Sequence, residues 1–423
     1  MTDDTGAPAP GPLRSAALGI FLLAVAVRVC AAGEVPSPLF WESEADFLEQ
    51  VEEGQFNDRL ELHLVQYSAD PRWLVEWAAQ RYSGNGLFGE YGSTESDELF
   101  VNSQIAVNLF PAKRLQMRYD RREYQDGRFD VSDQRIDALW YAGTGWALML
   151  SGWPTAEKEY ASMGLGVRIG APRSRNALEL SVMDERVVWN KKADGGVRFS
   201  GRPIRLLADG YYEAGPWRVH GSIDYGLEYE AAEAGAGETS PGRSTRGFQR
   251  FADVAVEYAP GDWGLGARLT FASLQRSQQE ETGQAHALDR SWGRLVLTAR
   301  KDLGRWSVYG LGGFATQRDE FSWLAAASGS YRMDAALFGV EGGLRAAKGL
   351  ELRLGYLGTS QDAKRAGADS AALPNREESL YLDKAHVRAI YTFAPGMSME
   401  LLLSQALRGG SFGGGSIKAL LVF

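Results

Sequence analysis

The 423-residue chain has a formal net charge of −9 and contains 50 glycines, a share well above the usual ~7%. Its 12 Trp, 17 Tyr and 18 Phe exclude a disordered chain, and its acidic balance argues against a nucleic-acid-binding protein. The longest apolar run, from Ala16 to Val27, is too short for a membrane-spanning helix, which needs ~20 residues. The composition therefore leaves one class of membrane protein open, the β-barrel.

The N-terminus has the pattern of a secretory signal peptide. Arg14 precedes the apolar run, and the small residues of Cys30-Ala31-Ala32 follow it, which predicts cleavage after Ala32. A buried core helix is the alternative interpretation. A lipid-modified cysteine is disfavoured because Arg28 and Val29 stand where small or mildly apolar residues are needed. Cleavage after Ala32 would leave a mature chain without cysteine, hence without disulfides or thiol chemistry.

A short helix is predicted next. Ser43 and Asp46 have the spacing of an N-terminal cap, and Gly54 ends the helical pattern. One face carries the apolar residues Ala45, Leu48 and Val51. We expect this helix in the periplasm, where it contacts a partner or lies across the barrel mouth. The predicted organisation is a signal peptide over 1–32, a periplasmic segment over 33–56 and a barrel over 57–423.

Beyond this helix the hydrophobic period becomes two, as in strands with one apolar and one polar face. Leu350, Leu352 and Leu354 alternate with Glu351 and Arg353, for example. Tight turns recur between such segments and several are flanked by aromatic residues, as in the interfacial girdle of a transmembrane barrel. These turns are predicted at 110–113, 142–144, 170–173, 214–216, 259–262, 302–304, 347–349 and 394–396.

Eight tight turns define sixteen strands, and one further strand is needed at each end. The last is predicted at Ser416–Phe423, and the first within Leu60–Tyr82. Because an even count keeps both ends of the barrel on one side, we predict an all-β, antiparallel up-and-down barrel of eighteen strands, with sixteen as the alternative. A cylinder of that width needs a channel or a plug, and 60–82 or the loop 230–245 could constrict it.

The end of the chain carries a family resemblance. The last residues alternate between two faces of a strand. One face carries Ile417, Ala419, Leu421 and the terminal Phe423, and the other carries Lys418, Leu420 and Val422. This pattern resembles the C-terminal strand of bacterial outer-membrane β-barrel proteins, which ends in Phe and is recognised by the barrel-assembly machinery. The resemblance implies a Gram-negative outer membrane, with lipid around the barrel. In size and in its arginine content the chain also loosely resembles porins that export anionic exopolysaccharide.

If the apolar faces contact lipid, the alternating polar residues line the lumen. Arginine outnumbers carboxylate among them, which favours the passage of anions. The alternative is that the arginines form cross-strand ion pairs that only stabilise the wall. The residues predicted to line the pore are Arg118, Arg122, Arg135, Arg168, Arg205, Arg218, Arg268, Arg294, Arg305, Arg345, Arg353, Arg388, Asp120, Asp224 and Glu351.

Nothing in the sequence favours catalysis. The four histidines, His63, His220, His286 and His386, lie on separate segments without zinc-binding spacing, and no nucleophile motif occurs. We therefore predict no enzyme activity, no metal and no cofactor.

Three functions are compatible with this reading. The first is a diffusion channel for polar, chiefly anionic solutes. The second is the exit porin of an exopolysaccharide export system, which predicts a periplasmic partner. The third is a barrel that sheathes an electron-carrying partner.

Overall fold

The computed structural model describes residues 40–41, 43–53, 82, 84–93, 99–125, 130–154, 160–189, 197–233, 242–323, 327–367, 375–408 and 410–422. The predicted boundaries at residues 32 and 56 lie outside these ranges. The helix and the first ten strands are α2 (Glu44–Glu53), β1 (Gly86–Ser93), β2 (Leu99–Ala112), β3 (Leu115–Gln125), β4 (Asp130–Tyr141), β5 (Trp146–Pro154), β6 (Tyr160–Ile169), β7 (Ala177–Trp189), β8 (Arg198–Gly201), β9 (Ile204–Ala214) and β10 (Trp217–Gly226). The remaining strands are β11 (Tyr229–Glu233), β12 (Arg243–Tyr258), β13 (Trp263–Glu280), β14 (Ala285–Leu303), β15 (Trp306–Trp323), β16 (Ala327–Ala347), β17 (Leu350–Ala366), β18 (Arg376–Ala394), β19 (Met397–Ala406) and β20 (Phe412–Val422).

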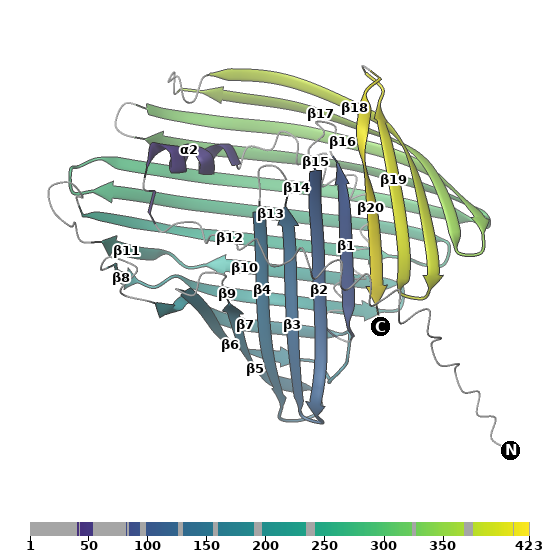
Figure 1. Ribbon diagram of the computed structural model, residues 1–423, viewed down its shortest axis with the longest axis horizontal. Helices are drawn as coiled ribbons and strands as arrows, with labels where there is room; N and C mark the ends of the chain where they lie inside the picture. Colours follow the sequence, from purple (N-terminus) through teal and green to yellow (C-terminus); the bar gives the residue numbers. More distant parts are fainter. Residues whose placement is uncertain are drawn as a thin grey trace.

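The strands form one closed barrel. Successive spanning strands pair antiparallel, and β1 pairs with β20, which leaves no free edge. The short strand β8 continues β9, and β11 continues β10, so the 20 strand segments make 18 spanning strands. The predicted all-β barrel and its count of eighteen are confirmed. In Figure 1, β1–β4 cross β12–β17 at a steep angle because the strands of the facing walls are tilted in opposite senses.

The first spanning strand is β1, between β2 and β20. The prediction that it comes from Leu60–Tyr82 is therefore wrong. The glycines at 86, 89 and 92 dilute the apolar alternation of β1, so the sequence signal is weak there. Tyr82 lies just before the strand, and residues 60–81 lie outside the described residues.

All eight predicted tight turns connect neighbouring strands at one end of the barrel. Gly304 and Gly396 have φ values of 70° and 76°, a left-handed conformation that glycine adopts without a steric penalty. The start of β1 and the end of β20 lie at this same end, since Gly86 pairs with Val422. We call it the short-turn end, and the opposite end the long-loop end.

The outer surface carries an apolar band next to the short turns. Leu165 and Leu354 project from it and are 70% and 65% exposed. Trp263 and Trp306 begin β13 and β15 at its lower border, and Trp217 packs on Tyr258 with ring centroids 4.5 Å apart. The alternation predicted from the sequence thus places apolar residues outside and polar residues inside.

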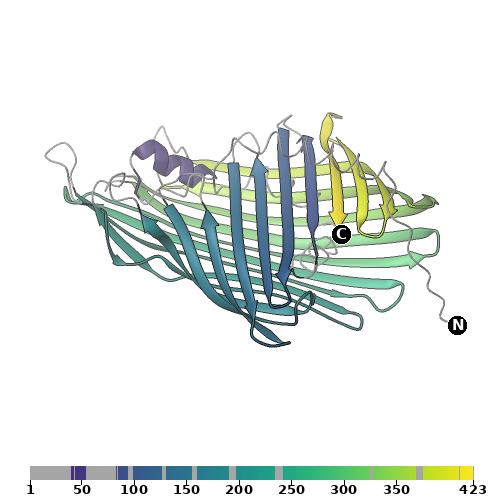
Figure 2. The same ribbon diagram turned by 60° about the horizontal axis from the view of Figure 1, so that its bottom comes forward.

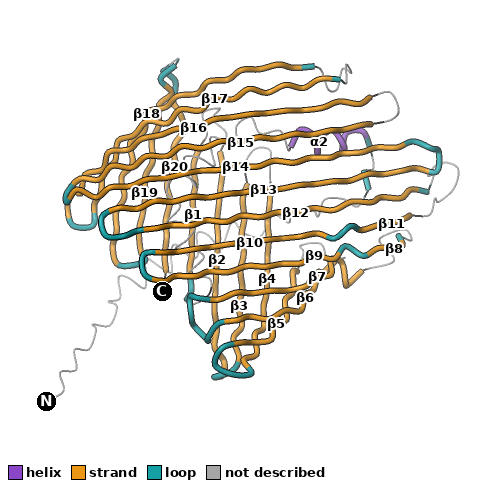
Figure 3. Tube along the Cα trace, turned by 180° about the vertical axis from the view of Figure 1, so that it is seen from behind, coloured by secondary structure: helices purple, strands orange, loops and turns teal. Residues whose placement is uncertain are grey.

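The two sides of the barrel differ in height. The spanning strands β3–β7 have 9 to 13 residues, whereas β12–β18 have 16 to 21. Figure 3 shows the long strands running side by side toward the long-loop end. On β15 the outward residues change from apolar Phe314 to Thr316 and Arg318. The long strands therefore extend beyond the apolar band as a polar outer collar.

The predicted helix forms as α2, with the Ser43 and Asp46 cap in place: each backbone N–H donates to the other residue's side chain, at 3.1 and 3.3 Å. The sequence left its position open between a contact with a periplasmic partner and a place across the barrel mouth. Phe47 and Val51 pack on inward-facing residues of β14–β16 near the long-loop end, so α2 lies inside the barrel (Figure 2). Among the described residues, no helix is long and apolar enough to cross a bilayer.

Candidate functional site: the lumen wall

On the low side of the barrel, the predicted arginines lie in one buried network with carboxylates. Arg118 on β3 donates to Asp137 on β4 at 2.8 Å and to Glu179 on β7 at 2.8 Å. Asp120 lies 3.2 Å from the same guanidinium, and Arg135 donates to Asp137 at 2.7 Å. The side chains of Arg118 and Asp137 are completely buried. We call these residues, together with Arg168, the low-side network.

Arg168 joins this network to the chain that precedes β1. Its guanidinium lies 3.4 Å from Glu179 and donates to the Tyr82 carbonyl oxygen at 3.1 Å. The tyrosine ring lies under the same guanidinium, at 5.4 Å. Tyr82 itself is fully buried against Ala177, Tyr211 and Ala255. The predicted pore residue Arg168 thus fastens residue 82 to the inner wall.

A second network lies where the barrel closes. Glu341 on β16 binds His386 at 2.8 Å, Arg388 at 3.0 Å and Arg353 at 3.4 Å. Gly355 makes room for it, because a Cβ there would collide with His386 and Glu341. Arg388 is also 3.5 Å from Glu400 on β19.

Lys418 completes this closure network between two carboxylates. Its ammonium lies 3.6 Å from Glu400 and 3.8 Å from Glu90 on β1, so the ion pairs cross the junction of β20 with β1. Neither Glu90 nor Lys418 is among the residues predicted to line the lumen. Lys418 could have been found from its alternation with outward Ile417, whereas Glu90 lies on the strand that was misplaced.

A third group lies at mid-height on the high side. Asp253 on β12 accepts hydrogen bonds from Arg268 at 2.8 and 2.9 Å and from Thr270 at 2.9 Å. Arg294 on the next strand is only 8% exposed, yet within the described residues it has no hydrogen-bond or ion-pair partner. Asp253 pairs with Arg268, so Arg294 adds a positive charge that no ion pair offsets among the described residues.

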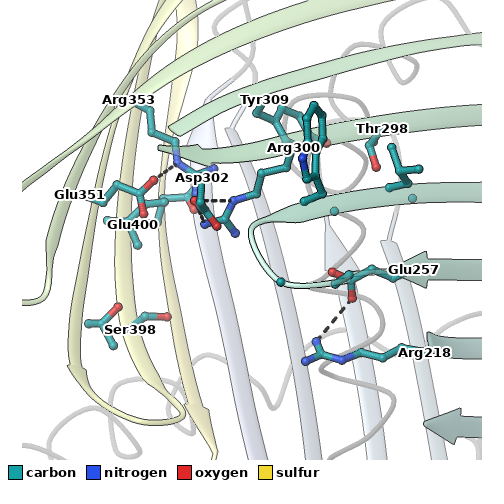
Figure 4. A pocket seen from close by; sticks show the side chains of 18 of the residues that line it. Arg218, Glu257, Thr298, Arg300, Asp302, Tyr309, Glu351, Arg353, Ser398 and Glu400 are labelled. Atoms are coloured by element: carbon teal, nitrogen blue, oxygen red, sulfur yellow. Dashed lines mark hydrogen bonds and ion pairs between the residues drawn. The ribbon is translucent and has the colours of Figure 1, made fainter. Parts of the chain in front are cut away.

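A cavity of about 440 Å³ opens at the short-turn end of the lumen (Figure 4). Arg218 and Glu257 lie on one side of it, and Arg353 and Glu351 lie on the other, with Arg300 between them. Their ion pairs measure 3.4 Å for Arg218–Glu257 and 2.9 Å for Arg353–Glu351. We call this cavity the vestibule.

Arginine reaches farther into the lumen than its partner in several pairs. The Arg218 side chain is 37% exposed and that of Glu257 is 6% exposed. Arg345, at the mouth, is 52% exposed, against 26% for Asp302. The order is reversed for Arg353 and Glu351, whose side chains are 7% and 19% exposed. Arg218 and Arg345 are thus the most exposed groups of these pairs, although Glu213, 3.9 Å from the Arg218 guanidinium, is also 35% exposed.

The other predicted residues have mixed outcomes. Arg205 and Asp224 form an ion pair on β9 and β10. Arg122 lies on β3 opposite Gln104, and its side chain is outside the described set. Arg305 does not line the wall: it occupies the turn after Gly304 and is exposed, because β15 begins only at Trp306.

The histidines do not converge on a metal site. His220 and His386 point inward beside carboxylates, His286 stacks on Trp323 at 3.7 Å, and His63 lies outside the described residues. Within the described ranges, no group of three or more His, Cys, Asp or Glu side chains is arranged to hold a metal ion.

The C-terminal strand has the orientation that its pattern predicts. Ile417 points outward and is 51% exposed, and Leu421 pairs with Leu87 across the closure. Phe423 lies outside the described residues. Recognition by an assembly machinery is therefore an expectation that rests on the sequence.

The sequence matches no protein-family model, and no curated protein resembles it significantly. Among solved structures, a loop-deletion mutant of OmpT, an outer-membrane protein of Vibrio cholerae, is 15% identical, with a TM-score of 0.39 over 80% of this chain and 97% of that one. OccK10 of Pseudomonas aeruginosa is 9% identical, with a TM-score of 0.36 over 81% and 98%. The outer-membrane channel DcaP of Acinetobacter baumannii is 12% identical, with a TM-score of 0.33 over 80% and 96%.

The strand pairing itself defines the class of this protein. A closed antiparallel barrel of 18 strands, apolar outside and polar inside, is the architecture of bacterial outer-membrane β-barrels. In that class the short turns face the periplasm and the long loops face outward.

Proposed function

We propose that the protein is a passive channel of the Gram-negative outer membrane for polar, preferentially anionic solutes. The observation that carries the proposal is the vestibule, where the Arg218 guanidinium reaches into the lumen while the Glu257 carboxylate is recessed against the wall. Selection would follow from the width of the lumen and from this charge field, without covalent steps or a cofactor.

The mid-height group supports the same preference. Arg294 lacks a partner among the described residues, so its charge adds to the positive field of the wall near Arg268, although its side chain is largely buried. The low-side network contributes little to selectivity, because its three arginines face the three carboxylates of Asp120, Asp137 and Glu179. That part of the wall follows the alternative of stabilising ion pairs.

Export of an anionic polysaccharide is the second candidate function. Such a polymer would meet the same arginines as a small anion, so the two functions differ only in the length of the solute that passes. A sheath for an electron-carrying partner is less compatible, because α2 occupies part of the lumen at the long-loop end.

The test is the reversal potential of purified protein in a planar bilayer under a salt gradient. We expect anion selectivity, and Arg218→Glu should lower the ratio of anion to cation permeability by about twofold or more. Arg332→Glu on the outer collar is the matched control and should change nothing, since that side chain faces away from the lumen. Cation selectivity in the native protein would overturn the anionic preference. An acidic oligosaccharide added to one side should reduce the chloride current if polymers enter the same path.

A further inference from the structure

We propose that α2 is a constriction element docked inside the channel, and that it sets the upper size limit for solutes at the long-loop end. The inference rests on the proposed channel function and assigns to that channel the element that determines its size selectivity. The proposal rests on a binding surface of the inner wall, which we call the seat. Its residues on β13–β16 hold both ends of the helix and cover its apolar face.

The segment before the helix is held by a reciprocal pair of hydrogen bonds. The Trp41 backbone N–H donates to the Gln278 side-chain oxygen at 2.8 Å, and the Gln278 amide donates back to the Trp41 carbonyl at 3.0 Å. The guanidinium of Arg276 lies 4.2 Å from the centre of the Trp41 ring. Both wall residues belong to β13, so one strand fixes the position and direction in which the chain enters the helix.

The end of the helix is held by a wall arginine. Arg290 on β14 donates to the carbonyl oxygens of Gln50 and Val51 at 3.1 and 2.8 Å. The last four carbonyl groups of a helix have no hydrogen-bond partner within the helix, so the arginine supplies one for two of them. Its positive charge also interacts favourably with the negative end of the helix dipole. Asp319 on β15 binds the same guanidinium at 3.0 Å and so orients it.

The apolar face of α2 meets an apolar area of the wall. Phe47 and Val51 are fully buried, and the Phe47 ring packs at 5.1 Å on both Trp41 and Trp323. Beneath them lie inward-facing side chains of β14–β16: Leu288, Phe321, Tyr331 and Met333. Inward positions of a wide barrel face water, so large apolar side chains there are stable only when another element covers them.

The position of the seat implies the consequence for transport. An α-helix with its side chains is about 10–12 Å wide, a large part of the lumen of a barrel of this size. Because α2 lies inside the wall at the long-loop end, a solute that crosses the barrel must pass beside it. The helix would therefore decide the largest solute that passes, while the vestibule arginines decide the charge.

The experiment detaches α2 from the inner wall by substitutions in the helix alone, so that the residues of the wall stay unchanged. The double variant Phe47→Asp/Val51→Asp places two carboxylates against the apolar seat, whereas Ala45→Asp adds a carboxylate on an exposed position of the same helix and serves as the control. Each purified protein is first checked for the mobility shift on boiling that a closed barrel shows on a gel. Single-channel conductance and the entry of sugars of graded size into proteoliposomes are then measured.

We expect the double variant to conduct about twofold more than the native protein and to admit larger sugars, with Ala45→Asp unchanged. A double variant that forms a closed barrel but keeps the native conductance and size limit would overturn the constriction, while the channel function would stand. If the native protein and the double variant both fail to conduct, the proposed channel function itself is wrong, and the constriction with it.

Discussion

The low and high sides of the barrel share the same alternation of inward and outward residues, but their inward residues differ in kind. On the low side, β3–β7 turn arginines and carboxylates inward, and these form a buried network around Arg118. On the high side, β13–β16 turn Leu288, Phe321 and Met333 inward, and α2 covers them. The inner face of this barrel is therefore not uniformly polar. Its side chains are charged where they pair with one another and apolar where a helix covers them.

The largest effect is expected from breaking the low-side network. Asp137→Ala removes the carboxylate that both Arg118 and Arg135 bind, and it leaves the three arginines of this network with two carboxylates, Asp120 and Glu179. Removing one partner of a buried ion pair typically costs about 3–5 kcal/mol, so the free energy of unfolding should fall by that amount.

The matched variant on the high side is Asp334→Ala. Asp334 pairs with Arg332 on the outer collar, where both side chains are about half exposed, so its removal should cost less than about 1 kcal/mol. Denaturant-induced unfolding in detergent would measure both values. Equal losses would mean that the two sides do not differ in the way that their burial indicates.

The next largest effect concerns the height of the apolar band. Leu354→Arg places a charge on the lipid-facing side of β17 and should destabilise the barrel by about 2–4 kcal/mol in a bilayer. Ser360→Arg, farther along the same outward face, should cost about 0–1 kcal/mol because that position lies in the collar beyond the band. Refolding into lipid vesicles at a series of urea concentrations would test the difference, and a similar penalty at both sites would place the collar inside the membrane.

The smallest effect on stability is expected at mid-height. Arg294→Gln removes a buried cation that has no partner in the described part of the chain. The free energy of unfolding should stay constant or rise by about 1 kcal/mol, while anion selectivity should decrease. Unfolding and reversal-potential measurements on the same preparation would check both, and a loss of stability would show that the guanidinium has a structural partner.

The sequence predicted the barrel well where the signal was local. The eight tight turns, the last strand and the inward direction of residues such as Arg118, Arg168 and Arg353 follow from alternation and turn chemistry, and the structure agrees with them. The prediction failed where that signal is weak. Glycines obscure β1, and one residue of error in the turn after Leu303 moved Arg305 from the turn onto the wall.

The composition of the wall could be predicted, but its pairings could not. Arg118 and Glu179 are 61 residues apart and lie on strands that are not hydrogen-bonded neighbours, so they meet only through the curvature of the closed wall. The same holds for Lys418 and Glu90, which the junction of β20 with β1 brings together.

By itself, the sequence determined the positions of the tight turns, the face on which most strand residues lie and the presence of a capped helix. These properties arise from the two-residue period of a strand, the backbone needs of tight turns and the spacing of a cap, all of which act within a few residues. Only the tertiary structure decided that α2 lies within the lumen and which arginines have carboxylate partners. Those outcomes depend on contacts between segments distant in the sequence, such as Trp41 and Gln278, 237 residues apart, and Arg118 and Glu179, 61 residues apart, which only the closed barrel brings together.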